Sequence, residues 1–169
     1  MSIRKILHYP DKRLRTPGAK VVSFDASLHT LIDDMAETMY AAPGVGLAAP
    51  QIGESKRLFL IDIATGDDEP SDLRVFINPE IVERSGDITW EEGCLSFPGI
   101  HEEIDRSERV KVRAQDRDGN PFELEAEGLL AVAIQHELDH LDGKLMVDHL
   151  GMLRRRVVHR EMTKREAAE

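Results

Sequence analysis

The sequence lacks any long apolar run. Its first residues, from Met1 to Leu7, contain no apolar stretch long enough for a signal peptide, and no later segment approaches the ~20 apolar residues of a membrane span. We therefore expect a protein that stays in the cytoplasm and has no membrane partner. Internal repeats and low-complexity segments are missing as well.

Cysteine is nearly missing too, because Cys94 is the one example in 169 residues. A single thiol excludes a disulfide within the chain and fits a compartment that keeps thiols reduced. A lone cysteine is more often a small buried hydrophobe than a ligand. Any chemical role for Cys94 must therefore be argued from its neighbours.

Positive charge is in short supply and unevenly distributed. The net charge is −10, which argues against a general DNA- or RNA-binding protein, because neutralising phosphates requires clustered cations. Residues 150–169 are the exception: six cations against three acids give +3 there and leave −13 for the rest. A solvated helix face is the simplest explanation of this basic tail.

Apolar residues, by contrast, are abundant enough for a folded core. They make up 41% of the chain and charged residues 32%, which is ordinary for a globular protein. A chain of 169 residues fits one compact domain. We expect residues 1–169 to form a single catalytic or binding domain.

The strongest periodic pattern predicts an amphipathic helix ahead of Gly44. Asp25 or Ser27 can cap its start, and Gly44 lies beyond its end. Apolar residues recur at helical spacing along one stripe that should face the core. This stripe comprises Leu28, Leu31, Ile32, Met35 and Met39.

Short β-rich runs follow, separated by glycine, proline and aspartate. We expect strands over residues 57–63, 75–78, 81–83 and 88–90, with an exposed acidic loop at 66–70. Two sets of residues alternate at period two around a turn at 116–120 and predict a hairpin with one buried face. They are Val110, Val112 and Ala114 on one strand, and Phe122, Leu124 and Ala126 on the other.

Residues 129–141 predict a helix that is apolar on every side and is therefore surrounded by the rest of the fold. A last helix is expected over about 149–165, with an inward face made of Leu150, Leu153, Val157 and Val158. Few strands, irregularly spaced helices and an antiparallel hairpin predict an α+β fold, in which antiparallel or mixed sheets pack around the central helix.

The central helix carries the pattern His-Glu-x-x-His. Positions i and i+4 of a helix project to one face, so His136 and His140 could bind one metal ion, with Glu137 as base toward a bound water. The alternative is a buried helix whose histidines form ordinary hydrogen bonds. Burying these polar groups on so apolar a helix without compensation would be costly, which weakens that alternative.

A catalytic site of this type usually has three protein ligands and one open position. A metzincin would have its third histidine where Met146 stands, and Glu161 lies in a basic helix that looks exposed. Cys94 is the remaining candidate, in a turn bounded by glycine and proline. One thiolate and two imidazoles are a sound ligand set for zinc or ferrous iron.

A third feature is the run of small residues before Gln51. Small residues permit close backbone approach, and the Gln51 amide could donate a hydrogen bond to a developing oxyanion. Taken alone, the segment is equally typical of a helix-to-strand connection.

Together, three segments resemble the signature motifs of bacterial peptide deformylases in order and spacing. They are Gly44-Val45-Gly46-Leu47-Ala48-Ala49-Pro50-Gln51, Glu92-Gly93-Cys94-Leu95-Ser96 and Gln135-His136-Glu137-Leu138-Asp139-His140. Residues 6–14 and 148–150 are also similar to the family, so the resemblance runs through the chain. This conjunction is far more specific than any one motif.

The resemblance implies a metal-dependent hydrolase that removes the N-formyl group from the initiator methionine of nascent polypeptides and releases formate. It assigns Cys94, His136 and His140 to one divalent ion, with Fe²⁺ as the native ion and Zn²⁺, Ni²⁺ or Co²⁺ as substitutes. Hydroxide generated at the ion would attack the formyl carbon. The resemblance makes Glu137 the general acid and base.

The same resemblance places an oxyanion hole at Gln51 and the backbone N–H of Leu95. Glu92 and Asp139 are expected to orient the imidazole N–H groups of the ligands. The substrate would be bound by an apolar methionine pocket and the glycines at its edge. These positions are Gly44, Val45, Gly46, Leu129, Val132 and Ala133.

Two positions depart from some members of the family. Pro43 and His101 stand where those members have a glutamate and an arginine, so we expect the contacts at the rim of the cleft to differ and the chemistry to be kept. The family's work at the ribosome exit also offers a second explanation of the basic tail, in which Arg154, Arg155, Arg156 and Arg160 contact ribosomal RNA.

Two other functions remain as alternatives. A zinc endopeptidase would use His136, His140 and Glu161, and it predicts that Cys94→Ala retains metal. A structural metal-binding domain would coordinate its ion fully and leave Glu137 without a catalytic role.

Overall fold

The computed structural model describes residues 2–64 and 71–168. Its helices are α1 (Ala26–Ala41), α2 (Gly128–Leu141) and α3 (Met152–Ala168), with short 3-10 helices η1 (Lys12–Arg15), η2 (Ala49–Ile52) and η3 (Met146–His149). Its strands are β1 (Gly46–Ala48), β2 (Leu58–Ile61), β3 (Arg74–Ser85), β4 (Ile88–Gly93), β5 (His101–Arg106), β6 (Arg109–Gln115) and β7 (Pro121–Glu127). The acidic loop predicted at 66–70 lies outside the described residues.

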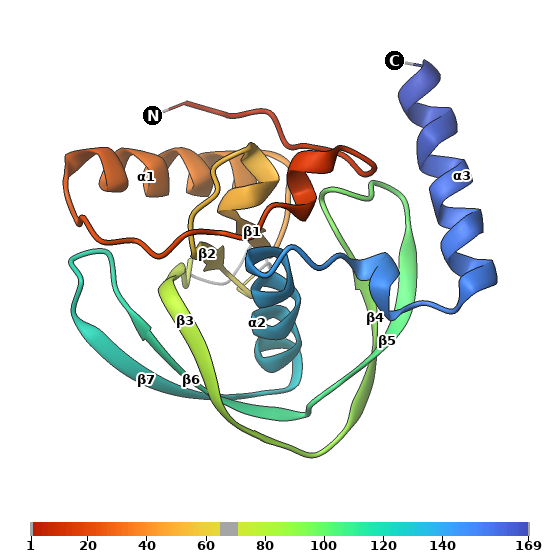
Figure 1. Cartoon of the computed structure of the whole chain (residues 1–169). Helices are drawn as coiled ribbons and strands as arrows, with labels where there is room; N and C mark the ends of the chain where they lie inside the picture. The colour runs from red at the N-terminus through yellow and green to blue at the C-terminus, as the bar shows by residue number, and fades with distance from the viewer. Residues whose placement is uncertain (1, 65–70, 169) are drawn as a thin grey trace.

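The strands form a five-stranded sheet in the order β1-β2-β3-β6-β7 and a two-stranded sheet of β4 and β5. Every pairing between these strands is antiparallel. Figure 1 shows α2 in the middle of the molecule, with β3, β6 and β7 on one side and β4 and β5 on the other. The predicted α+β fold around a central helix is confirmed.

The amphipathic stripe of α1 is confirmed at every position. All five of its predicted apolar residues are buried, and they belong to one core cluster with residues of β1 and β2. Asp25 caps the helix, since its carboxylate accepts a hydrogen bond from Leu28 N at 3.1 Å. Ser27 instead donates its hydroxyl to that carboxylate.

The predicted hairpin is also confirmed, as strands β6 and β7. Val110 pairs with Ala126, Val112 with Leu124 and Ala114 with Phe122. Of these residues, Val110, Val112, Ala114 and Ala126 are buried, while Leu124 and Phe122 are partly buried against the same core cluster. That cluster also contains Ala131, Ala133 and Ile134 of α2, so the hairpin covers one side of the central helix.

The two strands predicted at 75–78 and 81–83 are one continuous strand, β3. Asn78 adopts a positive φ of 51° ahead of Pro79, and the register with β6 shifts between Ile77 and Glu80. The Asn78 side chain offsets the lost ladder bonds, because its amide binds both the N–H and the carbonyl of Val21. A bulge therefore replaces the predicted break.

Strands β1 and β5 were not predicted. β1 has only three residues, too few to show an alternation, and β5 (His101–Arg106) has one apolar residue, Ile104. An exposed strand of a two-stranded sheet needs little apolar material, so its sequence carries a weak signal.

The inward face predicted for the last helix is wrong in part. Leu153 and Val157 are 77% and 50% exposed, whereas Val158 and Met162 are buried at i and i+4. The helix starts at Met152, after η3 and Gly151. Leu150 therefore lies outside it and does not determine which face of the helix is buried. Figure 1 shows α3 at the edge of the molecule. None of the described helices is long and apolar enough to cross a membrane.

Candidate metal centre

The helix α2 presents two imidazoles from one of its faces. His136 and His140 are separated by one turn, and their ring centroids lie 5.1 Å apart. His136 is 8% exposed and His140 is 1% exposed. The prediction that the His-Glu-x-x-His pattern lies on a helix is thus confirmed.

Cys94 reaches the same place from a tight turn after β4. Phe97 N donates to the Cys94 carbonyl at 2.9 Å, which closes the turn, and Gly99 supplies a positive φ of 78° just beyond it. The fully buried Phe97 anchors the turn in a core cluster shared with Val158 and Met162 of α3. The sulfur is therefore held by packing as well as by backbone hydrogen bonds.

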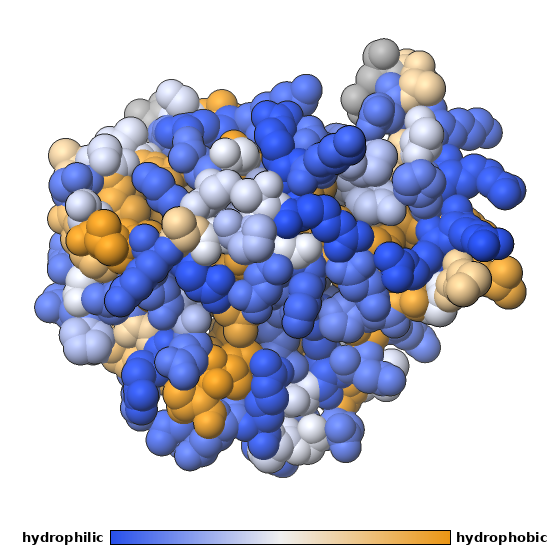
Figure 2. Space-filling model, in the orientation of Figure 1, coloured by the Kyte–Doolittle hydropathy of each residue, from blue (hydrophilic) through white to orange (hydrophobic). Residues whose placement is uncertain are grey.

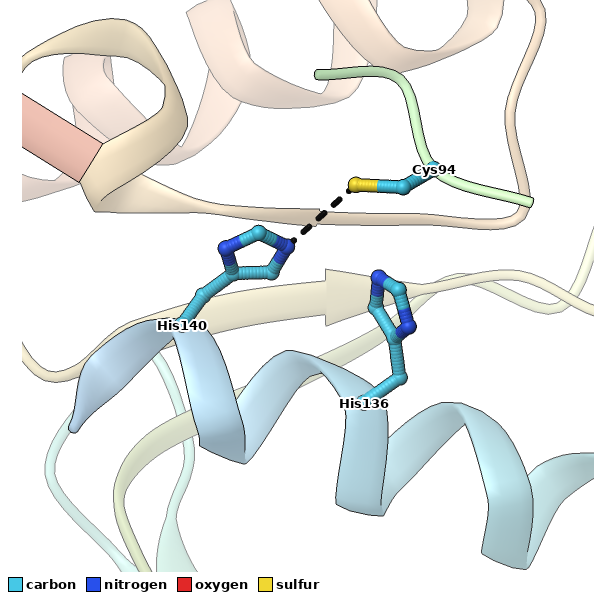
Figure 3. Close-up of side chains that lie close together, drawn as sticks. All are labelled: Cys94, His136 and His140. Carbon is cyan, nitrogen blue, oxygen red and sulfur yellow. Dashed lines mark hydrogen bonds between the residues drawn. The ribbon is translucent and has the colours of Figure 1, made fainter. Parts of the chain in front are cut away.

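These three side chains converge, as Figure 3 shows. Their ligand atoms all lie within 4.8 Å of one another, and Cys94 Sγ is 3.4 Å from His140 Nε2. A tetrahedral ion with metal–sulfur and metal–nitrogen bonds of usual length would separate those two atoms by about 3.5 Å. The geometry therefore fits one small divalent ion.

The electrostatics of His140 suit a ligand. Burial lowers the pKa of His140 to about 3, so the imidazole is neutral, as coordination requires. His136 is oriented from behind, because its Nδ1 lies 2.8 Å from Glu92 Oε1. That contact leaves Nε2 for the ligand position.

Glu137 lies beside the metal-ligand histidines, and one of its carboxyl oxygens has no hydrogen-bond partner among the described residues. Its Oε1 is buried and forms no hydrogen bond with the described residues. Burial raises the pKa of Glu137 to about 7. Its other oxygen contacts β1 so closely that a Cβ on Gly46 would lie 2.5 Å from Oε2. Glycine at 46 therefore makes room for the carboxyl group.

Gln51 reaches the cysteine from η2. Its Oε1 accepts the N–H of Ala48 at 2.9 Å, and its Nε2 lies 3.1 Å from Ser96 Oγ and 3.6 Å from Cys94 Sγ. Leu95 follows the sulfur directly, and its side chain covers Gly44, where a Cβ would lie 2.7 Å from Leu95 Cδ1. The two expected oxyanion donors thus border the sulfur.

A buried arginine ties the two expected orienting carboxylates together. Arg106 donates to both oxygens of Glu92 at 2.8 and 2.9 Å and to Asp139 at 2.7 Å. Asp139 Oδ2 also lies 2.8 Å from His149 Nε2. This orienting network, made of Arg106, Glu92, Asp139 and His149, links β4, the end of β5, α2 and η3.

The orienting network keeps both carboxylates charged. Burial alone would raise the pKa of Glu92, but hydrogen bonds from Arg106 and His136 outweigh it and lower that pKa. Burial opposes ionisation of Asp139 as well, yet the hydrogen bond with His149 and the charge of Arg106 lower its pKa to about 2. Neither Arg106 nor His149 was assigned to the site from sequence. The partners of Arg106 lie 14 residues away at Glu92 and 33 residues away at Asp139, so no local pattern indicates them.

We expect Arg106→Met to lower the free energy of unfolding of the metal-free protein by about 3–5 kcal/mol, because Glu92 and Asp139 would stay buried without their cation. Urea denaturation followed by circular dichroism measures this change. Arg113→Met is the matched control, since its ion pair with Glu123 is exposed. An equal loss of stability in the two variants would contradict the conclusion that Arg106 neutralises the buried carboxylates Glu92 and Asp139.

The expected substrate positions line the same region. Leu129, Val132 and Ala133 lie one to two turns before His136 on α2, and Leu129 is partly exposed while the other two are buried. Val45 is partly buried and precedes β1. Three of the four apolar positions are thus on the helix that carries both histidine ligands.

The two departures from the family pattern are peripheral. Pro43 is exposed after α1. His101 is exposed on β5 opposite Gly93, where a Cβ would lie 3.0 Å from its ring. Glu161, the ligand of the endopeptidase alternative, is not in the cluster and forms an i, i+4 ion pair with Arg165 on α3.

Comparison with known proteins gives one family by sequence and by structure. Residues 3–156 match the family model described as polypeptide deformylase. A peptide deformylase of Chromobacterium violaceum is 55% identical over 166 residues, which cover 98% of each chain. One of Pseudomonas aeruginosa is 52% identical and covers 97% of this chain and 96% of its own.

Solved structures agree with the sequence comparison. The crystal structure of a peptide deformylase from Legionella pneumophila has a TM-score of 0.92 and 51% identity, covering 99% of this chain and 97% of that one. A peptide deformylase from Ehrlichia chaffeensis, in complex with actinonin, has a TM-score of 0.91 and 37% identity, covering 98% and 99%.

Proposed function

This chain belongs to the peptide deformylase family, and on that premise we propose which of its residues remove the N-formyl group from the initiator methionine of nascent polypeptides. The observation that carries the proposal is the convergence of Cys94, His136 and His140 within 4.8 Å. We assign these three side chains as the ligands of one divalent ion, with the fourth side open to water and substrate.

A divalent ion held there would lower the pKa of a water molecule and would place a positive charge near the formyl oxygen. Glu137 accepts the proton of the attacking water with its unpartnered Oε1 and later donates it to the departing amine. Gln51 Nε2 and Leu95 N–H donate hydrogen bonds to the oxygen that becomes negative. The products are formate and a peptide with a free amino group.

The methionine side chain is assigned to the apolar surface formed by Val45, Leu129, Val132 and Ala133. Because α2 carries Leu129, Val132 and Ala133 one to two turns before His136, a bound side chain would lie beside that ligand. We assign Gly44 and Gly46 to the edge of this surface, where their lack of a side chain makes room for Leu95 and for the Glu137 carboxyl group. Burial of apolar area would supply most of the affinity for methionine.

Formate release tests this function. Metal-loaded protein is expected to release formate from a formyl-Met-Ala-Ser peptide and not to cleave the Met-Ala bond of the unformylated peptide. Cleavage of the peptide backbone without formate release would instead support an endopeptidase. Purification without oxygen, followed by metal analysis, tests the native ion, which we propose to be Fe²⁺, although thiolate and imidazole ligands suit Zn²⁺, Ni²⁺ and Co²⁺ as well.

We also propose where in the cell the enzyme acts. Nascent chains are made in the cytoplasm, and we place the enzyme there, with the basic helix α3 as its contact with the ribosome. Figure 2 shows hydrophilic residues along the outer side of α3. Arg154 pairs with Glu102 and Arg155 with Asp148, so these two arginines are partly neutralised.

Arg156 and Arg160 form no ion pair within the described residues, and they line a groove together with Tyr9, His159 and Lys164. We expect the double variant Arg156→Glu/Arg160→Glu to bind ribosomes at least tenfold more weakly and to have a less steep salt dependence, because fewer phosphates are contacted. Sedimentation at several salt concentrations measures both quantities.

The control for this variant is Arg109→Glu/Arg113→Glu, which reverses two exposed arginines of β6 away from α3. Its ribosome affinity should equal that of the parent protein. Unchanged binding by the α3 variant would remove the ribosome contact from the proposal and leave a solvated helix face as the explanation.

A further inference from the structure

The amide of Gln51 is held at both of its ends. The side chain is 1% exposed, and Oε1 accepts the N–H of Ala48 at 2.9 Å. Since the backbone donor fixes the position of the oxygen, Nε2 must lie on the other side, where it donates to Ser96 Oγ at 3.1 Å. Cys94 Sγ lies 3.6 Å from the same nitrogen.

Burial and backbone hydrogen bonds hold the residue that carries this hydroxyl. Ser96 has no exposed surface, and its carbonyl accepts the N–H of Tyr9 at 2.9 Å. The next residue, Phe97, closes the turn onto the Cys94 carbonyl and stacks on Tyr9 with ring centroids 4.8 Å apart. A rigid turn therefore carries both the sulfur and the hydroxyl.

We propose that Ser96 is a positioning residue that fixes the plane of the Gln51 amide. A single hydrogen bond would leave the amide free to turn about that bond, whereas bonds at both ends fix its plane. Ser96 occupies one of the two Nε2 hydrogens, so the other is directed to the side of the Cys94 sulfur. The consequence for catalysis rests on the proposed role of Gln51 as an oxyanion donor.

Side-chain NMR tests the positioning directly. The chain has only three glutamines, Gln51, Gln115 and Gln135, and two asparagines, Asn78 and Asn120, so the amide signals are few. In zinc-loaded protein we expect Ser96→Ala to speed the solvent exchange of a Gln51 Nε2 hydrogen at least tenfold. Thr38→Val, which removes another buried hydroxyl, is the control. Unchanged exchange in Ser96→Ala would overturn the proposal.

Kinetics test whether the positioning matters for the reaction. Ser96→Ala should lower kcat for formate release about tenfold with unchanged metal content, but by less than twofold in a Gln51→Ala background, because its effect passes through that amide. An equal fall in both backgrounds would show that Ser96 acts elsewhere and would overturn the proposal. A parent protein that releases no formate would refute the proposed function, while the exchange measurement would still decide the role of Ser96.

Discussion

Glu137→Gln should lower kcat for formate release by about 10² to 10⁴ while the protein keeps its metal ion. Glutamine has the shape of glutamate and fits the space beside Gly46, but its amide cannot accept and return a proton. Metal binding should persist, because Glu137 is not one of the three converging ligands. Formate release and metal content, measured on the same preparation, separate the two effects.

The matched control is Glu125→Gln, which makes the same chemical change on the exposed side of β7. It should leave kcat within twofold of the parent value. If Glu137→Gln kept kcat within threefold of the parent with a full complement of metal, Glu137 would not be the proton carrier, and a structural metal-binding domain would become the better explanation of the site.

Cys94→Ser should weaken metal binding by more than a hundredfold, beyond the 10- to 100-fold expected from losing a residue that merely orients a ligand. A serine hydroxyl stays protonated near neutral pH and is a poor ligand, so two imidazoles alone would remain. Competition with a chelator for zinc measures the affinity. Formate release should fall in parallel with bound metal.

Glu161→Gln provides the opposite control. Glu161 lies on α3 in an exposed pair with Arg165, and its loss should leave the metal affinity unchanged. The zinc endopeptidase alternative predicts the reverse order of the two variants. Retention of zinc by Cys94→Ser together with its loss from Glu161→Gln would therefore replace the proposed ligand set.

The parts of the site that sequence analysis could predict are those whose partners are close along the chain. His136 and His140 are one helical turn apart, so the apolar pattern of the helix was enough to place both imidazoles on one face. Cys94 lies 46 residues from His140, and no local pattern joins them. Its place was expected from a missing third ligand and from resemblance to a family.

The orienting network shows what sequence could not provide. Glu92 and Asp139 were expected to orient the ligand histidines, and Glu92 does contact His136 Nδ1. The expectation is wrong for Asp139, which instead binds Arg106 and His149, while His140 Nδ1 has no hydrogen-bond partner among the described residues. The cation between Glu92 and Asp139, Arg106, is the last residue of β5, a strand that the sequence did not predict. A buried arginine is recognisable only from its carboxylate partners, and here two different segments bring them to it.

The last helix shows a limit of periodicity itself. Leu150, Leu153 and Val157 have helical spacing, but the chain passes through η3 and Gly151 before α3 begins. The buried pair is therefore Val158 and Met162, which pack near the Cys94 turn. Burial of an edge helix depends on how the chain enters it, which is set by tertiary contacts rather than by its own sequence.

X-ray absorption of the zinc-loaded protein tests the central claim most directly. The proposed site predicts one sulfur at about 2.3 Å and two imidazole nitrogens at about 2.0–2.1 Å from the ion, with an oxygen in the remaining position. A spectrum without sulfur, or one in which nitrogen and sulfur atoms of the protein fill all four positions, would contradict an open hydrolytic centre built from Cys94, His136 and His140.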